Sequence, residues 1–229
     1  MKNIHKKKIG IITYDYNHLK TEQVVFPICD KGYEIIIYAL PFFERPRRKT
    51  LFNHRPEQFK GMHPREMSQK IDAEYVVCSN DFEIDDRCDY YLVTGAGILS
   101  EKCVSNKKII NCHPGLIPMS RGLDSFKWAI YDYIPVGNTL HFIDHRVDAG
   151  EIIHQEITPL FEMDTIADFA NRHYEQEIKM LIDFERYVEG CGGNIPELKE
   201  GIVHKRMNAN IEEEMLNRFE NYKSKFSKG

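Results

Sequence analysis

The sequence lacks the patterns that mark several large classes of protein. Its six cysteines form no CxxC pair, which excludes the usual zinc-finger spacing and indicates reduced thiols. No apolar run approaches membrane-spanning length, and the apolar run after the basic start is too short for a signal peptide. We therefore expect a cytoplasmic protein that does not bind membranes.

Excess positive charge is also absent. The net charge is -4 and the isoelectric point is near 6.2, so the chain as a whole does not attract a nucleic-acid backbone. The first strand–helix junction, "IGIITYDYNHLK", contains no GxGxxG and no glycine-rich phosphate loop. Because those loops cradle the phosphates of dinucleotides and triphosphates, NAD and ATP are not favoured as ligands.

Short apolar runs rich in Ile, Val and Tyr alternate with longer amphipathic ones, as in α/β proteins. The pattern predicts strands at residues 8–14, 33–40, 73–79, 88–97 and 107–113, and helices at 17–32, 64–72 and 124–133. Near-continuous apolar strands are typical of parallel sheets buried on both faces. The predicted fold class is α/β, with a mostly parallel twisted sheet flanked by helices.

Two further strands are predicted at 135–145 and 150–157, before a long helix that begins after Thr165 and ends at Gly190. We expect residues 1–190 to form the catalytic domain. Residues 191–229 are expected to form a link and a helical tail that packs on this domain or on a partner subunit. The terminal helix carries Ile211, Met215, Phe219 and Tyr222 on one stripe, which indicates a docking or dimer face.

The segment "NCHPGLIPMSRG", residues 111–122, is the clearest candidate for a functional site. Asn111 and His113 end a predicted strand two residues apart, so both side chains face one crevice. Asp148 follows in a turn between two strands. Asn, His and Asp together supply donors and a proton acceptor for acyl transfer to an amine without a covalent enzyme intermediate. The alternative is an Asn that caps a turn and a His that hydrogen-bonds a loop.

The segments "IINCHPGLIPMSRG" and "VGNTLHFIDHRVDAGEIIHQEI" resemble the folate-dependent formyltransferase family in motif and spacing, over roughly residues 90–157. The resemblance implies a Rossmann-like formyltransferase fold, 10-formyltetrahydrofolate as formyl donor and a primary amine as acceptor. It places the catalytic residues at Asn111, His113 and Asp148. It further implies a folate pocket, without a metal, formed by Gly97, Ile98, Leu99, His141, Ile143 and Asp144.

The acceptor is inferred partly by elimination. Methionyl-tRNA formyltransferases carry a further carboxyl-terminal domain and basic character, and purine-pathway formyltransferases have a Ser/Gly/Asn-rich phosphate loop after the first strand. The basic, aromatic segment 42–59 instead suits a pyrophosphate and a base, although such a charge run alone is more often a solvated loop. We therefore expect a nucleotide-linked amino sugar of cell-surface polysaccharide biosynthesis, with Phe52, Asn53, His54 and Arg55 as contacts.

Several alternatives remain. The acceptor could be phosphoribosylglycinamide, and the chain could be a folate-binding module without activity. A Cys–His hydrolase would need Cys112 and His113 to cooperate, but neighbours on a strand face opposite sides. A metallohydrolase built on His141, Asp144, His145 and Asp148 lacks a recognised zinc spacing. A homodimer is also left open.

Overall fold

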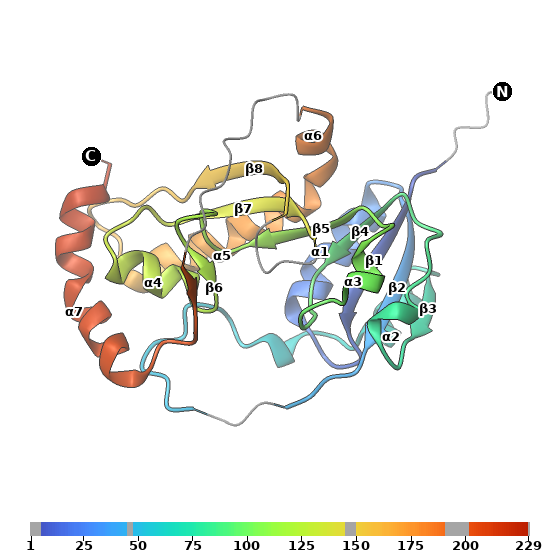
Figure 1. Ribbon diagram of the computed structural model, residues 1–229, viewed down its shortest axis with the longest axis horizontal. Helices are drawn as coiled ribbons and strands as arrows, with labels where there is room; N and C mark the ends of the chain where they lie inside the picture. The colour runs from blue at the N-terminus through green and yellow to red at the C-terminus, as the bar shows by residue number, and fades with distance from the viewer. Residues whose placement is uncertain (1–5, 45–47, 145–149, 191–201, 229) are drawn as a thin grey trace. The chain divides into compact units, whose positions relative to one another are not determined.

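The computed structural model describes residues 6–44, 48–144, 150–190 and 202–228. The chain divides into two compact units. Unit 1 comprises Met1–Glu44, Glu57–Asn111 and Phe142–His145, and unit 2 comprises Arg45–Pro56, Cys112–His141 and Arg146–Gly229. Figure 1 shows the elements of each unit. The predicted boundary at residue 190 differs from this division and stays a prediction.

Unit 1 is a parallel sheet with helices between its strands. Its strands are β1 (Lys8–Tyr14), β2 (Glu34–Leu40), β3 (Glu74–Val77), β4 (Tyr90–Val93) and β5 (Ile109–His113), whose last two residues belong to unit 2. They lie in the order β3-β2-β1-β4-β5, and each adjacent pair is parallel. The helices are α1 (Leu19–Asp30), α2 (Pro64–Lys70) and α3 (Glu101–Val104), with short 3₁₀ turns η1 (Gln58–Lys60) and η2 (Asp81–Glu83). The α/β prediction is confirmed.

The core of unit 1 explains why β1 contains a glycine among isoleucines. Ile9, Ile11 and Ile12 are fully buried, as expected for a central parallel strand. A Cβ at Gly10 would lie 2.4 Å from the ring of Tyr91. Gly10 therefore leaves the space in which a neighbouring strand places a large aromatic ring.

The described residues of unit 2 contain two pairs of strands and four helices. β7 (Gly137–Phe142) pairs antiparallel with β8 (Ile152–Ile157), and β6 (Arg121–Gly122) pairs parallel with β9 (Val203–His204). The helices are α4 (Ser125–Tyr131), α5 (Ile166–Ile182), α6 (Phe184–Glu189) and α7 (Ala209–Phe226). The predicted single helix up to Gly190 is wrong in one respect, since it is interrupted at Asp183. The predicted capping box of Thr165 with Asp168 is present at the start of α5.

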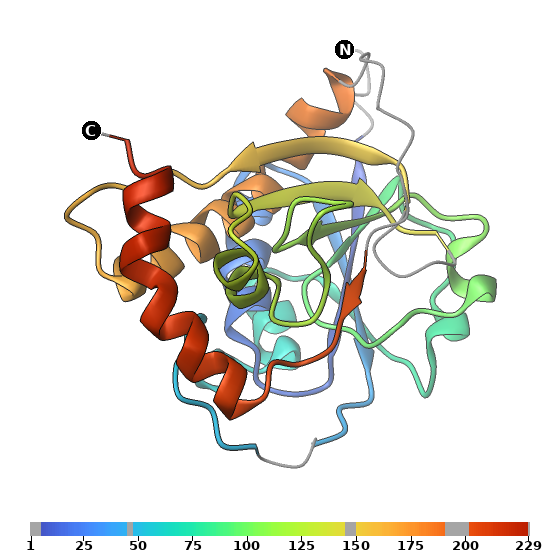
Figure 2. The ribbon, with the colours of Figure 1, turned by 60° about the vertical axis from the view of Figure 1, so that its left-hand side comes forward.

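The apolar stripe of α7 is buried within its own chain. Met215, Phe219 and Tyr222 belong to the core cluster that contains Phe126 of α4 and Phe169 of α5, and Figure 2 shows α7 running beside α4. The hydroxyl of Tyr222 donates to the carbonyl of Ile134 over 3.0 Å. Of the two alternatives for this stripe, packing on its own chain or on a partner subunit, the contacts within unit 2 correspond to the first. A homodimer is left without this support and stays a prediction.

Within the described residues, no helix is long and apolar enough to cross a membrane.

Candidate functional site

Strand β5 delivers Asn111 and His113 to its carboxyl end, as the sequence predicts. Residues two apart on a strand project to the same side. Asn111 is partly buried, whereas His113 is only 3% exposed. A buried imidazole must be held by hydrogen bonds, and these define its orientation.

The ring of His113 is fixed through Nε2. This atom lies 2.9 Å from the carbonyl oxygen of Ser120 and 3.1 Å from Oγ of Ser125. The Ser125 hydroxyl donates to the carbonyl of Gly122 over 3.0 Å, so its oxygen can accept from the ring. Because the carbonyl of Ser120 can only accept, Nε2 carries the hydrogen in the neutral ring. Any second proton of His113 is therefore bound at Nδ1.

The turn after His113 has almost no free space. A Cβ at Gly115 would lie 2.4 Å from the Ser120 carbonyl oxygen and 2.8 Å from Nε2 of His113. The hydroxyl of Thr139 on β7 donates to the carbonyl of Gly115 over 2.7 Å and accepts from the N–H of Ile117 over 3.1 Å. This packing fixes the turn and with it the carbonyl group of Ser120, which orients His113. Such rigid support is what a preorganised site requires.

The strand β8 supports the same turn. Nε2 of Gln155 donates to the carbonyl of Ile117 over 2.7 Å and to the hydroxyl of Thr139 over 2.9 Å. The peptide bond between Ile117 and Pro118 is cis. The backbone groups of the turn thus find partners on two strands of unit 2.

The remaining predicted catalytic residue, Asp148, lies outside the described residues, as does His145 of the alternative metal site. His141 lies on β7 and is 2% exposed. In the part of the chain that the structure describes, no group of three or more His, Cys, Asp or Glu side chains could hold a metal ion.

The predicted folate segments meet in unit 1. Leu99 is buried in the core cluster of this unit, and Ile143 packs against the same cluster. The N–H of Ile143 donates to the carbonyl of Ile109 on β5 over 2.8 Å. Ile98 is 83% exposed, and nothing lies within 4 Å of a Cβ built on Gly97. Asp144 is partly buried. The segments 97–99 and 143–144 therefore pack on the same core cluster. The side chain of Ile98 is exposed there, and the space next to Gly97 is open.

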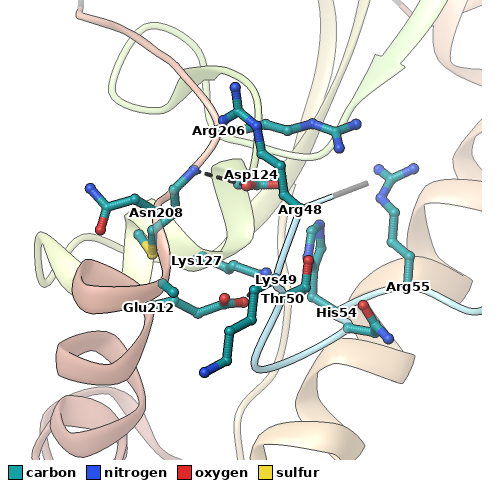
Figure 3. A pocket seen from close by; sticks show the side chains of 13 residues that line it. Arg48, Lys49, Thr50, His54, Arg55, Asp124, Lys127, Arg206, Asn208 and Glu212 are labelled. Atoms are coloured by element: carbon teal, nitrogen blue, oxygen red, sulfur yellow. Dashed lines mark hydrogen bonds and ion pairs between the residues drawn. The ribbon is translucent and has the colours of Figure 1, made fainter. Parts of the chain in front are cut away.

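Unit 2 also contains a basic pocket of about 440 Å³, within the size range of small-molecule sites. Figure 3 shows its side chains, which come from the 48–55 loop, from α4 and from the start of α7. The lining residues are Arg48, Lys49, Thr50, Asn53, His54, Arg55, Asp124, Lys127, Arg206, Met207, Asn208, Ala209 and Glu212.

Three of the four predicted acceptor contacts line this pocket. They are Asn53, His54 and Arg55. Phe52 does not line it, since its ring packs 6.5 Å from that of Phe126 in the core cluster of unit 2. Lys127 and Arg206, which the sequence analysis did not single out, also contribute basic groups.

Two ion pairs with buried carboxylates hold the pocket together. The Lys127 ammonium pairs with the carboxylate of Glu212, and their side chains are 4% and 2% exposed. That carboxylate also accepts the N–H groups of Leu51 and Phe52 over 2.8 and 3.2 Å. Burial raises the pKa of Glu212, but these N–H groups and Lys127 outweigh it and leave the pKa below its usual value.

On the other side of the pocket, the Arg55 guanidinium lies 2.6 Å from the buried carboxylate of Glu177 on α5. The charge of Arg55 is therefore compensated inside the protein.

Two histidines beside the pocket are held neutral. The ring of His54 lies parallel to that of Phe126, with centroids 5.8 Å apart. Burial, and then the positive charge of Arg55, lower the pKa of His54 well below its ordinary value. Burial lowers the pKa of His173 to about 4. The carboxylate of Glu177 raises the pKa of His173, whereas the charges of Arg55 and His113 lower it.

The parallel sheet, with Asn111 and His113 at the end of β5, defines a protein of the α/β class. Residues 87–184 match the family model described as formyl transferase, which confirms the resemblance over this segment. Phosphoribosylglycinamide formyltransferase from Haemophilus influenzae is 35% identical over 115 residues, which are 44% of this chain and 54% of that protein. The chain thus spans about half the length of this relative.

Solved formyltransferases share the fold. A 4-N formyltransferase from Francisella tularensis has a TM-score of 0.62 and 19% identity, with 93% of this chain and 87% of that chain covered. The formyltransferase PseJ from Anoxybacillus kamchatkensis, solved with UDP-4,6-dideoxy-4-formamido-L-AltNAc and tetrahydrofolate, has a TM-score of 0.51 and 20% identity. That alignment covers 92% of this chain and 90% of PseJ.

Proposed function

We propose that the protein is an N-formyltransferase that moves the formyl group of 10-formyltetrahydrofolate to the primary amine of a nucleotide-linked amino sugar. The observation that carries the reaction is the end of β5, where Asn111 and the fixed ring of His113 stand two residues apart within the segment that matches the family model. No group in this arrangement needs to become a covalent nucleophile.

The chemistry follows from the charge that develops during attack. The acceptor amine forms a bond to the formyl carbon, and negative charge gathers on the formyl oxygen. The amide of Asn111 donates to this oxygen, and one such donor is typically worth ~3 kcal/mol. His113 donates from Nδ1 when it carries its second proton, because Nε2 is engaged by Ser120.

The reaction ends when the bond between the formyl carbon and N10 of the folate breaks. N10 then takes a proton, and the attacking amine must lose one. We assign acceptance of the amine proton to Asp148, which the family resemblance places in this role. General acid–base help of this kind contributes ~10²–10⁴-fold in rate.

The folate is proposed to bind beside Gly97, Ile98 and Leu99 and along His141, Ile143 and Asp144. The support is the exposed Ile98 next to the space at Gly97, since an exposed apolar side chain beside space suits the flat ring of a pterin.

The nucleotide sugar is supported by the pocket that Asn53, His54 and Arg55 line, because basic groups and a histidine suit a diphosphate with its sugars. PseJ, which shares the fold, was solved with a UDP-linked sugar. Phosphoribosylglycinamide is the second candidate, and the relative from Haemophilus influenzae favours it.

Mass spectrometry of the protein with 10-formyltetrahydrofolate and a panel of nucleotide-linked amino sugars tests the proposal. We expect one sugar to gain a carbonyl unit with wild-type protein and with Asn106→Ala, whose side chain is exposed before β5. His113→Ala and Asn111→Ala should lose the product. Formylation of glycinamide ribonucleotide alone would select the second candidate, and no formyl transfer to any amine would refute the reaction.

A further inference from the structure

Three basic side chains line the pocket of unit 2 and have no partner among the described residues. Arg48, Lys49 and Arg206 are exposed and line it, and within the described residues none of them makes a hydrogen bond or an ion pair. Lys127 and Arg55, by contrast, are neutralised by Glu212 and Glu177. Exposed like charges gathered in one pocket repel one another, so the pocket favours an anion.

The start of α7 adds to this preference. Ala209, the first residue of this 18-residue helix, lines the pocket. Asn208 caps the helix by accepting the N–H of Ile211 over 3.0 Å, and the preceding N–H groups have no partner within the helix. A helix N-terminus stabilises negative charge, particularly phosphate.

The acidic and neutral groups of the pocket point to an anion that carries a sugar. Asp124 accepts the N–H of Met207 over 3.0 Å and keeps carboxylate oxygens at the pocket wall, where they repel an anion but accept from a hydroxyl. His54 is neutral and offers one donor and one acceptor. Inorganic diphosphate carries no hydroxyl groups that could donate to Asp124 or pair with the neutral ring of His54. A ribose carries such hydroxyl groups.

We propose that this pocket binds a nucleoside diphosphate, with the diphosphate held by Arg48, Lys49, Arg206 and the start of α7, and the ribose held by Asp124 and His54. The inference rests on the proposed function, since the nucleoside diphosphate is the non-reacting part of the acceptor. Its place fits that role, because Asp124 of the pocket directly precedes Ser125, whose Oγ lies 3.1 Å from Nε2 of His113. The tail after residue 201 thereby takes part in acceptor binding.

Isothermal titration of the full chain with UDP, dTDP, GDP and inorganic pyrophosphate tests the pocket separately from catalysis. We expect saturable binding of at least one nucleoside diphosphate. Arg206→Ala and Lys49→Ala should each raise its Kd about 10- to 100-fold, the range for one lost charge-assisted contact. Lys205→Ala is the matched control, because Lys205 is exposed and adjacent to Arg206 but does not line the pocket, and it should bind like wild type.

The outcomes separate this inference from the proposed function. No saturable binding, equal weakening in Lys205→Ala and Arg206→Ala, or pyrophosphate binding as tight as that of the best nucleotide would each overturn the pocket assignment. Nucleoside diphosphate binding that Arg206→Ala weakens, in a protein that formylates no sugar, would support the pocket and refute the proposed reaction. Circular dichroism of each variant checks that the fold is retained.

Discussion

Glu212 of α7 holds the buried ammonium of Lys127 on α4 while it accepts the backbone N–H groups of the 48–55 loop. One carboxylate thus joins three segments that lie far apart in the sequence. The loop carries Lys49, Asn53 and His54 into the pocket, so the shape of the pocket depends on this pair.

Glu212→Gln removes the negative charge but keeps the size of the side chain. We expect the free energy of unfolding to fall by about 3–5 kcal/mol, because Lys127 is left buried without a counter-charge. Urea denaturation measures this change. Glu213→Gln, one residue along and exposed, serves as the control and should unfold like wild type. A Glu212→Gln variant within about 1 kcal/mol of wild type would show that the pair is not desolvated in solution.

Thr139→Val tests the support of the turn after His113. The hydroxyl of Thr139 satisfies the carbonyl of Gly115 and the N–H of Ile117. Thr139→Val leaves both backbone groups unsatisfied, which should lower the free energy of unfolding by about 1–3 kcal/mol. We also expect kcat to fall at least ~10-fold with little change in KM, because the turn orients His113 rather than binding substrate. Thr139→Ser keeps the hydroxyl and should restore kcat. If Val and Ser behave alike, the hydroxyl has no positioning role.

Gly115→Ala tests how closely the turn packs on the imidazole. The new Cβ would lie 2.4 Å from the Ser120 carbonyl oxygen and 2.8 Å from Nε2 of His113, so one of these groups must move. We expect a loss of kcat of at least ~10²-fold, as for a misplaced catalytic group, with a folded protein by circular dichroism. Gly190→Ala is the comparison, because its nearest atom would lie 3.3 Å from the new Cβ. Full activity in Gly115→Ala would contradict the assigned orientation of His113.

The strands and the β5 motif could be predicted because their signals are local. The Ile-rich runs of β1 and β2 mark buried strands, and the two-residue spacing of Asn111 and His113 already places them on one side. The break of the long helix at Asp183 could not be predicted, since the apolar period continues to Phe184, which is buried. What covers the stripe of α7 could not be predicted, because periodicity identifies an apolar face but not the surface that packs on it.

The pocket depends on contacts that leave no local signal. Arg206 comes after the pairing of Gly122 with His204, in strands of two residues each. Gly122 has a φ of +88°, and a Cβ there would lie 2.3 Å from the carbonyl oxygen of His204. Neither a two-residue strand nor a single glycine predicts such a pairing. The sequence therefore could not show that Arg206 lines the same pocket as residues of the basic 42–59 segment.

The buried ring of His173 should make the stability of the protein sensitive to acid. Its pKa is lowered to about 4 by burial, whereas an unfolded chain has a histidine pKa of about 6.5. Between these values the unfolded chain binds the extra proton, so the free energy of unfolding decreases as the pH falls from about 6.5 to 4. The slope is about 1.4 kcal/mol per pH unit for this one residue. Above about pH 6.5 the ring is neutral in both states, and this residue no longer lowers the free energy of unfolding.

His173→Asn separates this contribution from the rest, because an amide in place of Nδ1 can keep the hydrogen bond with Thr158, whose hydroxyl lies 2.8 Å away. Urea denaturation at pH 7.0 and 5.0 measures it. We expect the variant to be less stable than wild type at pH 7.0, but to lose roughly 2 kcal/mol less on acidification, by the linkage above. Some loss remains because the pKa of His54 is lowered in the same direction. Equal losses in the two proteins would mean that His173 is hydrated and titrates normally, which would contradict the burial of its ring.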